Sequence, residues 1–152
     1  MSVAIRYAGN QVEAEEVFND AFFKVFSKMN QFDEKRSFKS WFRQIVVYTA
    51  IDYNRKYKKM KPYQIEEEII ADTDNNVGWD NLLYNDILKH IQKLPPSYRI
   101  VFNMRAIEGY KHREIAEQLG ISEGSSKSSY SKARHLLQTA LKNDQSRYYK
   151  HG

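Results

Sequence analysis

The 152-residue sequence contains no cysteine, which excludes a disulfide framework and a cysteine-based metal site. Its four histidines, His90, His112, His135 and His151, lack the spacing of metal ligands, so we expect neither a metal nor a cofactor. No apolar run reaches the roughly 18 residues of a membrane span, and the N-terminus has no basic stretch followed by an apolar signal-peptide core. These absences predict a cytoplasmic protein with no membrane insertion.

Acidic residues are outnumbered by basic ones and are distributed unevenly along the chain. The net charge is +5 and the isoelectric point is about 9.3. This balance favours an anionic partner such as nucleic acid, although ribosome-associated and membrane-surface proteins share it. Asp52 is the only acid between Lys35 and Lys61, whereas residues 62–81 contain six acids and no Lys or Arg. Turn-forming residues and the absence of an apolar period predict a flexible acidic linker over 62–81.

Helical periodicity dominates on both sides of this linker, and no strand alternation of useful length occurs. The apolar residues of segment 12–29 recur at helical spacing, at Val17, Phe18, Ala21, Phe22, Val25 and Phe26. Segment 38–59 has a second amphipathic pattern through Trp41, Ile45, Tyr48 or Thr49, and Asp52. We therefore predict an all-α protein of two small helical domains, 1–61 and 82–145, with a tail at 146–152.

The second domain contains a helix-turn-helix pattern. A helix is expected from a proline start near Pro96 to Gly109, and two more in "HREIAEQLGISEGSSKSSYSKARHLLQ" with a break at Gly120. Gly120 can adopt the left-handed turn conformation, and Ser122 can accept a hydrogen bond from a free amide of the next helix. The sequence predicts that the last helix buries a face through Ser126, Tyr130, Ala133, Leu137 and Leu141.

When this face of the last helix is buried, short hydroxyls and cations on its other side point outward. Such side chains suit a major groove, because Ser can bond phosphate or base edges and Lys or Arg can bind phosphate or guanine. The predicted DNA-binding residues of this helix are Ser125, Lys127, Ser128, Ser131, Lys132 and Arg134. A helical hairpin with a solvated Ser/Lys face is the alternative interpretation.

Both halves resemble a known family. Residues 94–141, "LPPSYRIVFNMRAIEGYKHREIAEQLGISEGSSKSSYSKARHLLQTAL", are similar to region 4 of bacterial RNA polymerase sigma factors of the extracytoplasmic function (ECF) type. The segments "EAEEVFNDAFFKVFSKMNQF" and "SFKSWFRQIVVYTAIDYNRK" resemble region 2 of the same family, in the same order along the chain. The resemblance implies a non-catalytic promoter-specificity subunit whose partners are core RNA polymerase, promoter DNA and an anti-sigma factor.

The resemblance also implies roles for individual residues. In the family, region 2 holds an unstacked base of the minus-ten element, and bases of this kind stack on aromatic side chains while cations follow the backbone. The corresponding residues here are Phe32, Lys39, Trp41, Tyr48, Arg55, Lys56 and Lys59. The residues that match the polymerase-docking helix are Glu16, Asn19, Asp20 and Lys24. For all of these, core packing or solubilising charge is the competing interpretation.

Several positions depart from the family pattern. Tyr48 stands where Asn is common, Ser126 where Val is usual, and Ser129 where Arg is usual. We interpret Ser126 as a loss of core packing and Ser129 as a loss of phosphate contact. "MSVAIRYAG" matches the end of a helix, so the resemblance implies that region 2 lacks its first N-terminal helix.

Three other functions remain open. A stand-alone helix-turn-helix transcriptional regulator would bind duplex DNA without polymerase, but it leaves the aromatic and basic first half unexplained. A degenerate sigma-like interaction module would bind an anti-sigma partner only. A nucleic-acid enzyme such as a recombinase would need a carboxylate cluster or a nucleophile ringed by Arg, and the acids here lie in the linker or on separate helical turns.

Overall fold

The computed structural model describes residues 1–57 and 79–150, and the side chains of 1–57 and 84–144. The chain forms two compact units, residues 1–60 and 61–152, which are described separately below. The described residues form helices and no strand, so the prediction of an all-α protein with two helical units is confirmed. Most of the predicted linker, 62–81, lies outside the described residues, and α4 begins within it at Trp79.

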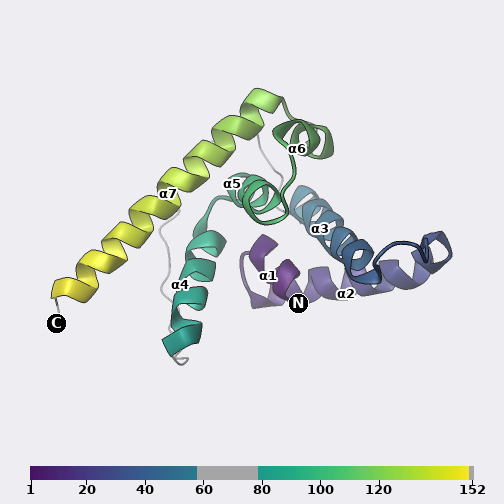
Figure 1. The fold of residues 1–152 in the computed structure, drawn as a ribbon, viewed down its shortest axis with the longest axis horizontal. Helices are drawn as coiled ribbons and strands as arrows, with labels where there is room; N and C mark the ends of the chain where they lie inside the picture. Colours follow the sequence, from purple (N-terminus) through teal and green to yellow (C-terminus); the bar gives the residue numbers. More distant parts are fainter. Residues whose placement is uncertain (58–78, 151–152) are drawn as a thin grey trace. The chain divides into compact units, whose positions relative to one another are not determined.

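The first unit contains three α-helices and a short 3-10 turn. They are α1 (Ser2–Tyr7), α2 (Gln11–Lys28), η1 (Met29–Gln31) and α3 (Phe38–Tyr57). Figure 1 shows the chain turning after α2 and returning along it as α3. The short helix α1 packs against both α2 and α3, and its Tyr7 is fully buried.

Helix α2 buries a narrower stripe than its sequence predicts. Asn10 caps its start by accepting a 3.0 Å hydrogen bond from the amide of Glu13. The buried residues are Ala14, Val17, Ala21 and Val25. Phe22 and Phe26 continue the apolar period but are 49% and 64% exposed, so the apolar pattern of α2 is wider than its buried stripe. The described part of the unit has no element over that side of α2, and periodicity alone cannot reveal this.

Helix α3 buries the side opposite Tyr48. Its buried residues are Ile45, Val46, Val47, Thr49, Ala50, Ile51 and Asn54. Of the two candidates for the apolar face, Thr49 is therefore buried, whereas Tyr48 is 36% exposed and Asp52 is exposed. The exposed Tyr48 is consequently free of the core role that competes with a binding role.

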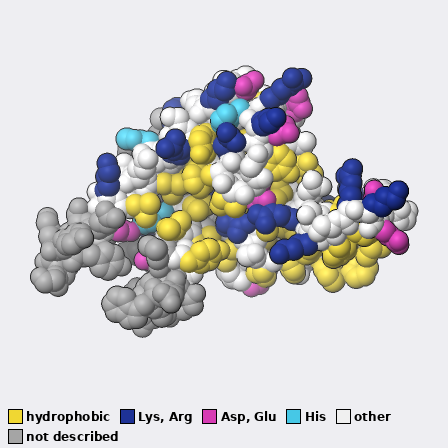
Figure 2. Space-filling model, in the orientation of Figure 1, with side chains coloured by type: hydrophobic (Ala, Val, Ile, Leu, Met, Phe, Trp, Pro, Cys, Tyr) yellow, Lys and Arg dark blue, Asp and Glu magenta, His cyan; other side chains and the backbone are white. Residues whose placement is uncertain are grey.

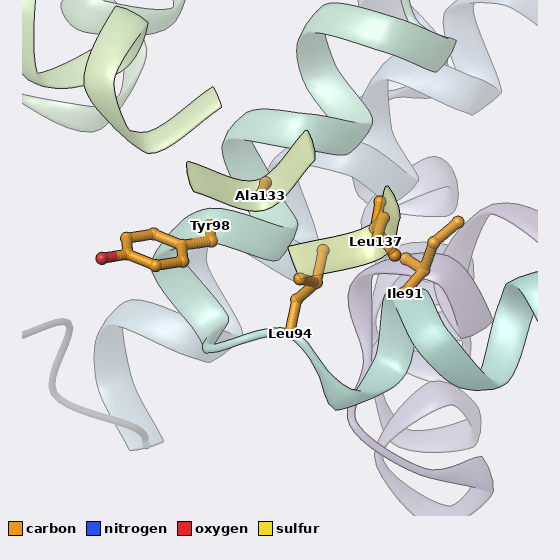
Figure 3. Close-up of a cluster of buried hydrophobic side chains, with 5 residues drawn as sticks. All are labelled: Ile91, Leu94, Tyr98, Ala133 and Leu137. Carbon is orange, nitrogen blue, oxygen red and sulfur yellow. The ribbon is translucent and has the colours of Figure 1, made fainter. Parts of the chain in front are cut away.

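The second unit consists of helices from the C-terminal half. They are α4 (Trp79–Lys93), α5 (Pro96–Phe102), η2 (Asn103–Ile107), α6 (His112–Leu119) and α7 (Glu123–Lys150). A cluster of Ile91, Leu94, Tyr98, Ala133 and Leu137 joins α4, α5 and α7. Figure 3 shows Ile91, Leu94 and Leu137 near one another, with the Tyr98 ring extending away from them. His90 of α4 adds a polar link to α7, with its Nε2 2.6 Å from Oδ2 of Asp144.

Two boundaries in this unit differ from the sequence prediction. The helix that begins at Pro96 becomes a π-helical turn, η2, before Gly109, whose φ of 82° ends the helical conformation. At the other end, α7 continues to Lys150, through most of the segment predicted as a tail at 146–152. Residues 142–150 contain neither Gly nor Pro, so no residue there stops the helix.

Candidate nucleic-acid and protein interfaces

The turn between α6 and α7 has the geometry that its sequence predicts. Gly120 has φ 66° and ψ 36°, in the left-handed region that favours glycine. Ser122 Oγ accepts a 3.0 Å hydrogen bond from the amide of Ser125, which caps the start of α7. Ile115 and Leu119 of α6 are buried against this turn. The helix-turn-helix prediction is confirmed.

The predicted rotation of α7 is confirmed at its most buried positions. Ser126, Ala133 and Leu137 are buried, whereas Tyr130 and Leu141 are partly exposed. The cations and hydroxyls on the other side are exposed, at Lys127, Ser128, Ser131, Lys132 and Arg134. Figure 2 shows Lys and Arg side chains, with acidic ones between them, over α6 and the start of α7. This face can meet an anionic surface.

Local contacts already hold some of these side chains. Ser125 Oγ accepts a 2.8 Å hydrogen bond from Ser122 Oγ, so it belongs to the helix cap and is only partly exposed. Lys127 Nζ lies 2.8 Å from a carboxylate oxygen of Glu123, and this cation lowers the pKa of Glu123. The guanidinium of Arg134 lies 5.8 Å from the centre of the Tyr130 ring. Lys127 and Arg134 are thus oriented before any ligand arrives.

The two serines that depart from the family pattern are both buried. Ser126 is fully buried, but its Oγ lies 3.0 Å from Nδ1 of His112, so its hydroxyl has a hydrogen-bond partner. Ser129 is only 3% exposed, and its interpretation as a lost phosphate contact stays a prediction. The role of His112 was missed because it lies 14 residues from Ser126 and the contact depends on the fold.

In the first unit, aromatic side chains gather between η1 and the start of α3. The Phe32 ring lies 5.0 Å from that of Trp41 and 5.6 Å from that of Phe38, between ring centres. Phe38 stacks on Phe42 at 6.1 Å and is 46% exposed. The structure thus brings together two of the predicted minus-ten residues, Phe32 and Trp41, in one partly exposed cluster.

Tyr48 stands apart from this cluster. Over the described ranges, no aromatic ring contact joins Tyr48 to Phe32, Phe38 or Trp41. Lys39 is exposed one residue into α3. Of the aromatic residues matched to the minus-ten element, Phe32 and Trp41 therefore lie together, and Tyr48 is exposed farther along α3.

The C-terminal part of α3 carries cations on its surface. Arg55 Nη1 lies 3.9 Å from Asp52, and Lys56 Nζ lies 4.9 Å from the centre of the Tyr57 ring. Both cations are exposed. Lys59 lies outside the described residues.

The four residues matched to polymerase docking lie on the accessible side of α2. Glu16, Asn19 and Asp20 are exposed and Lys24 is partly exposed. Glu16 accepts a 2.6 Å hydrogen bond from the hydroxyl of Tyr53, and Lys24 lies 3.6 Å from Asp52. Glu16 and Lys24 therefore also tie α2 to α3, which the sequence could not reveal because the partners are far apart along the chain.

An apolar patch continues this side of α2. It consists of Phe22, Phe23, Phe26 and Met29, which are 46% to 73% exposed. The Phe22 and Phe26 rings pack edge to face at 5.1 Å, and Figure 2 shows the patch over the C-terminal part of α2. Exposed apolar patches of this kind mark protein-interaction surfaces. Among the described residues, no group of acids and histidines could hold a metal ion, and no helix has the length and apolar character of a membrane span.

Comparison with known families gives two matches. Residues 1–60 match the model of Sigma-70 region 2, and residues 84–137 match the model of Sigma-70, region 4. The matched segments leave out only residues 61–83 and 138–152.

Individual relatives agree with these matches. RNA polymerase sigma factor SigV of Bacillus subtilis is 29% identical over 139 residues, covering 91% of this chain and 82% of that protein. The ECF sigma factor SigW of the same organism is 29% identical over 152 residues, covering 90% and 80%. The ECF sigma-E factor of Escherichia coli is 23% identical, covering 82% and 72%.

Solved structures show the same fold. RpoE of Bartonella quintana, in complex with the anti-sigma factor NepR, aligns with a TM-score of 0.56 and 23% identity, covering 93% of this chain and 88% of that one. CnrH, in complex with the cytosolic domain of CnrY, aligns with a TM-score of 0.54 and 21% identity, covering 93% and 79%.

Proposed function

This chain belongs to the sigma-70 family, with the region 2 and region 4 of its ECF type, and we propose that it directs RNA polymerase to specific promoters and assists DNA melting. In this role the chain supplies specificity and carries out no chemistry of its own. It acts in the cytoplasm, where polymerase and promoter DNA meet.

The observation that supports this function most strongly is the pairing of two surfaces on one chain. The exposed face of α7, with Lys127, Ser128 and Ser131, offers cations for phosphate and hydroxyls for base edges. The aromatic cluster of Phe32, Phe38 and Trp41 offers faces on which an unstacked base can lie. A protein that only binds duplex DNA needs the first surface alone.

The two units take different parts of the promoter in this proposal. The second unit places α7 in the major groove of the minus-thirty-five element, where Lys127, Lys132 and Arg134 contact phosphate and Ser128 and Ser131 contact bases or bridging water. The first unit holds an unstacked minus-ten base between the aromatic cluster and Tyr48. Its cations, Lys39, Arg55, Lys56 and Lys59, follow the strand backbone.

Two protein partners belong to this proposal. Asn19 and Asp20 of α2, beside Glu16 and Lys24, contact core RNA polymerase. An anti-sigma factor is the second partner, and the complex of the Bartonella quintana neighbour with NepR supports this proposal.

Reconstitution tests the function directly. The chain is added to sigma-free core polymerase with a pool of promoter fragments, and the start sites of the transcripts are sequenced. We expect transcripts from a subset of promoters that share two short elements, and none from core polymerase alone. A chain that binds core polymerase but supports no initiation would overturn the proposal.

The same experiment separates the alternative functions. A stand-alone regulator would protect specific duplexes in the absence of polymerase and would not promote initiation by core enzyme. A degenerate interaction module would bind an anti-sigma partner, fail to select promoters and leave core transcription unchanged.

A further inference from the structure

A buried hydroxyl lies at the centre of the helix-turn-helix. Ser126 is fully buried in the first turns of α7, and its Oγ lies 3.0 Å from Nδ1 of His112, the first residue of α6. A buried hydroxyl without a partner costs about 1 to 3 kcal/mol. His112 removes this cost, and the resulting hydrogen bond joins the two helices of the motif.

The same imidazole also contacts the next turn of α7. Its ring centre lies 5.7 Å from that of Tyr130, at an angle of 64° between the ring planes. Tyr130 in turn stacks on Phe102 of α5 at 6.1 Å, and the guanidinium of Arg134 lies over its ring. One side chain of α6 therefore holds two positions of α7 that are four residues, or about one turn, apart.

These two contacts restrain the rotation of α7 about its own axis. Apolar packing is non-directional, so a small turn of the helix changes it little. A hydrogen bond weakens steeply when its angle changes, so the bond between His112 and Ser126 resists such a turn. Because Lys127 and Ser128 directly follow Ser126, and Ser131 directly follows Tyr130, their outward directions depend on the same rotation.

We propose that His112 is a positioning residue for sequence readout, which sets the rotation of α7 through Ser126 and Tyr130 and thereby the sequence preference of its outer face. The inference rests on the proposed function, because it requires that α7 reads duplex DNA. His112 itself contacts no base in this arrangement. Its effect passes through the direction of Ser128 and Ser131.

The charges around the ring favour a neutral imidazole. Arg105 acts on it from η2, and Lys127 and Glu123 act from α7. Burial, followed by Arg105 and Lys127, lowers the pKa of His112 from its usual 6.5, and Glu123 partly opposes them. Because the folded state disfavours the charged ring, stability that is present above pH 6.5 is lost as the pH falls through the lowered pKa.

Three variants of the full chain separate the hydrogen bond from the ring packing. His112→Phe keeps a ring against Tyr130 and removes the bond, Ser126→Ala removes the hydroxyl, and His112→Asn keeps a hydrogen-bonding group near the place of Nδ1. His135→Phe, at an exposed histidine of α7, is the matched control. Each variant is assembled with core polymerase, and its preference is measured on promoter fragments with a randomised minus-thirty-five element.

We expect His112→Phe and Ser126→Ala each to lower the ratio of cognate to scrambled binding about tenfold, as for the loss of a good base contact. In the double variant this ratio should fall no further than in either single variant, because both substitutions remove the same hydrogen bond. His112→Asn should recover part of the ratio, and His135→Phe should leave it unchanged. The extra loss of stability below pH 6.5 should disappear in His112→Phe.

The outcomes distinguish this inference from the function on which it rests. A wild-type chain with no sequence preference would overturn both. If the wild type is selective and the variants select the same sequences at the same ratio, only the inference about His112 is overturned. Lower melting temperatures with an unchanged preference would also overturn it, because the pair would then be only structural. If His112→Phe does not fold, the same comparison is made between Ser126→Ala and His112→Asn.

Discussion

At the scale of single residues, side chains assigned to binding also hold the fold together. Glu16 is matched to polymerase docking, yet its carboxylate accepts a hydrogen bond from Tyr53. This bond, followed by burial and the charge of Glu16, raises the pKa of Tyr53 to about 12. A variant of such a residue changes two properties at once, so binding and folding have to be measured separately.

Tyr53→Phe tests this link. It should lower the free energy of unfolding by no more than about 1 kcal/mol, because the bond is exposed. The raised pKa means that the wild type loses stability as the pH rises from 10 through 12, and this loss should be smaller in the variant. Urea unfolding at several alkaline pH values measures both effects. Identical pH slopes would show that Glu16 and Tyr53 are not coupled.

The aromatic residues of the first unit provide a second test. Tyr48→Ala should reduce open-complex formation by about 1 to 3 kcal/mol, the usual contribution of one stacked base, without changing the melting temperature. Phe32→Ala should reduce both open-complex formation and the melting temperature, because Phe32 packs against Phe38 and Trp41. Permanganate footprints and thermal unfolding measure the two effects. Wild-type footprints from folded Tyr48→Ala would exclude Tyr48 from the pocket.

At the scale of elements, α2 and α7 each have a buried side and an exposed side, and the proposed binding residues lie on the exposed side. On α2, Asn19 and Asp20 are exposed beside the apolar patch, whereas Ala14 and Val17 are buried. On α7, Ser126 and Ser129 face inward and Ser128 and Ser131 face outward. The role of each serine in α7 therefore depends on its position around the helix and not on its residue type.

Charge reversal on α2 tests the docking surface. Asp20→Lys should weaken binding to core polymerase and leave the melting temperature unchanged. Glu16→Lys should weaken binding and also lower the melting temperature, because it removes the acceptor of the Tyr53 bond. Glu34→Lys, with the same charge change in the loop before α3, is the control for net charge. Pull-down of core polymerase gives the readout, and full binding by Asp20→Lys would contradict the assignment.

The salt dependence of DNA binding tests whether the lysines of α7 contact phosphate and its serines contact bases. Lys127 pairs with Glu123, so its removal also exposes a carboxylate to DNA phosphate. In the background of Glu123→Ala, Lys127→Ala should weaken binding to all duplexes and reduce the salt slope by about one. Ser128→Ala should leave the slope unchanged and reduce the preference for cognate DNA. A sequence-dependent effect of Lys127→Ala would mean that this cation contacts bases.

At the scale of the whole molecule, the function needs two units on one chain. In the proposed function each unit offers one DNA-binding surface, and the connection between the units raises the effective concentration of the second surface once the first is bound. Promoter selection should therefore depend on the connection as well as on both surfaces.

A protease site placed within 62–81 tests this dependence. Cleavage should leave both units helical by circular dichroism, yet reduce promoter-specific initiation by a factor of about 100 or more at submicromolar protein. The uncleaved variant is the control. Full initiation after cleavage would mean that binding to polymerase is enough to place the two units on the promoter, without the connection between them.

The sequence by itself determined the all-α fold, the helix-turn-helix and the family. The fold and the motif follow from local chemistry, namely the helical spacing of apolar residues, the left-handed conformation of Gly120 and the cap at Ser122, whereas the family follows from the resemblance of both halves to sigma-factor regions. The local pattern also predicted that Lys127 and Ser128 face outward, because they adjoin the buried Ser126.

Only the tertiary structure decided which apolar residues are buried and which polar residues meet. Phe22 and Phe26 have the same helical period as Val17 and Ala21, but burial also needs a partner element, which the described part of the unit does not place over them. The bonds from Tyr53 to Glu16 and between His112 and Ser126 join residues 37 and 14 positions apart. No local pattern records such contacts, because they depend on which helices the fold brings side by side.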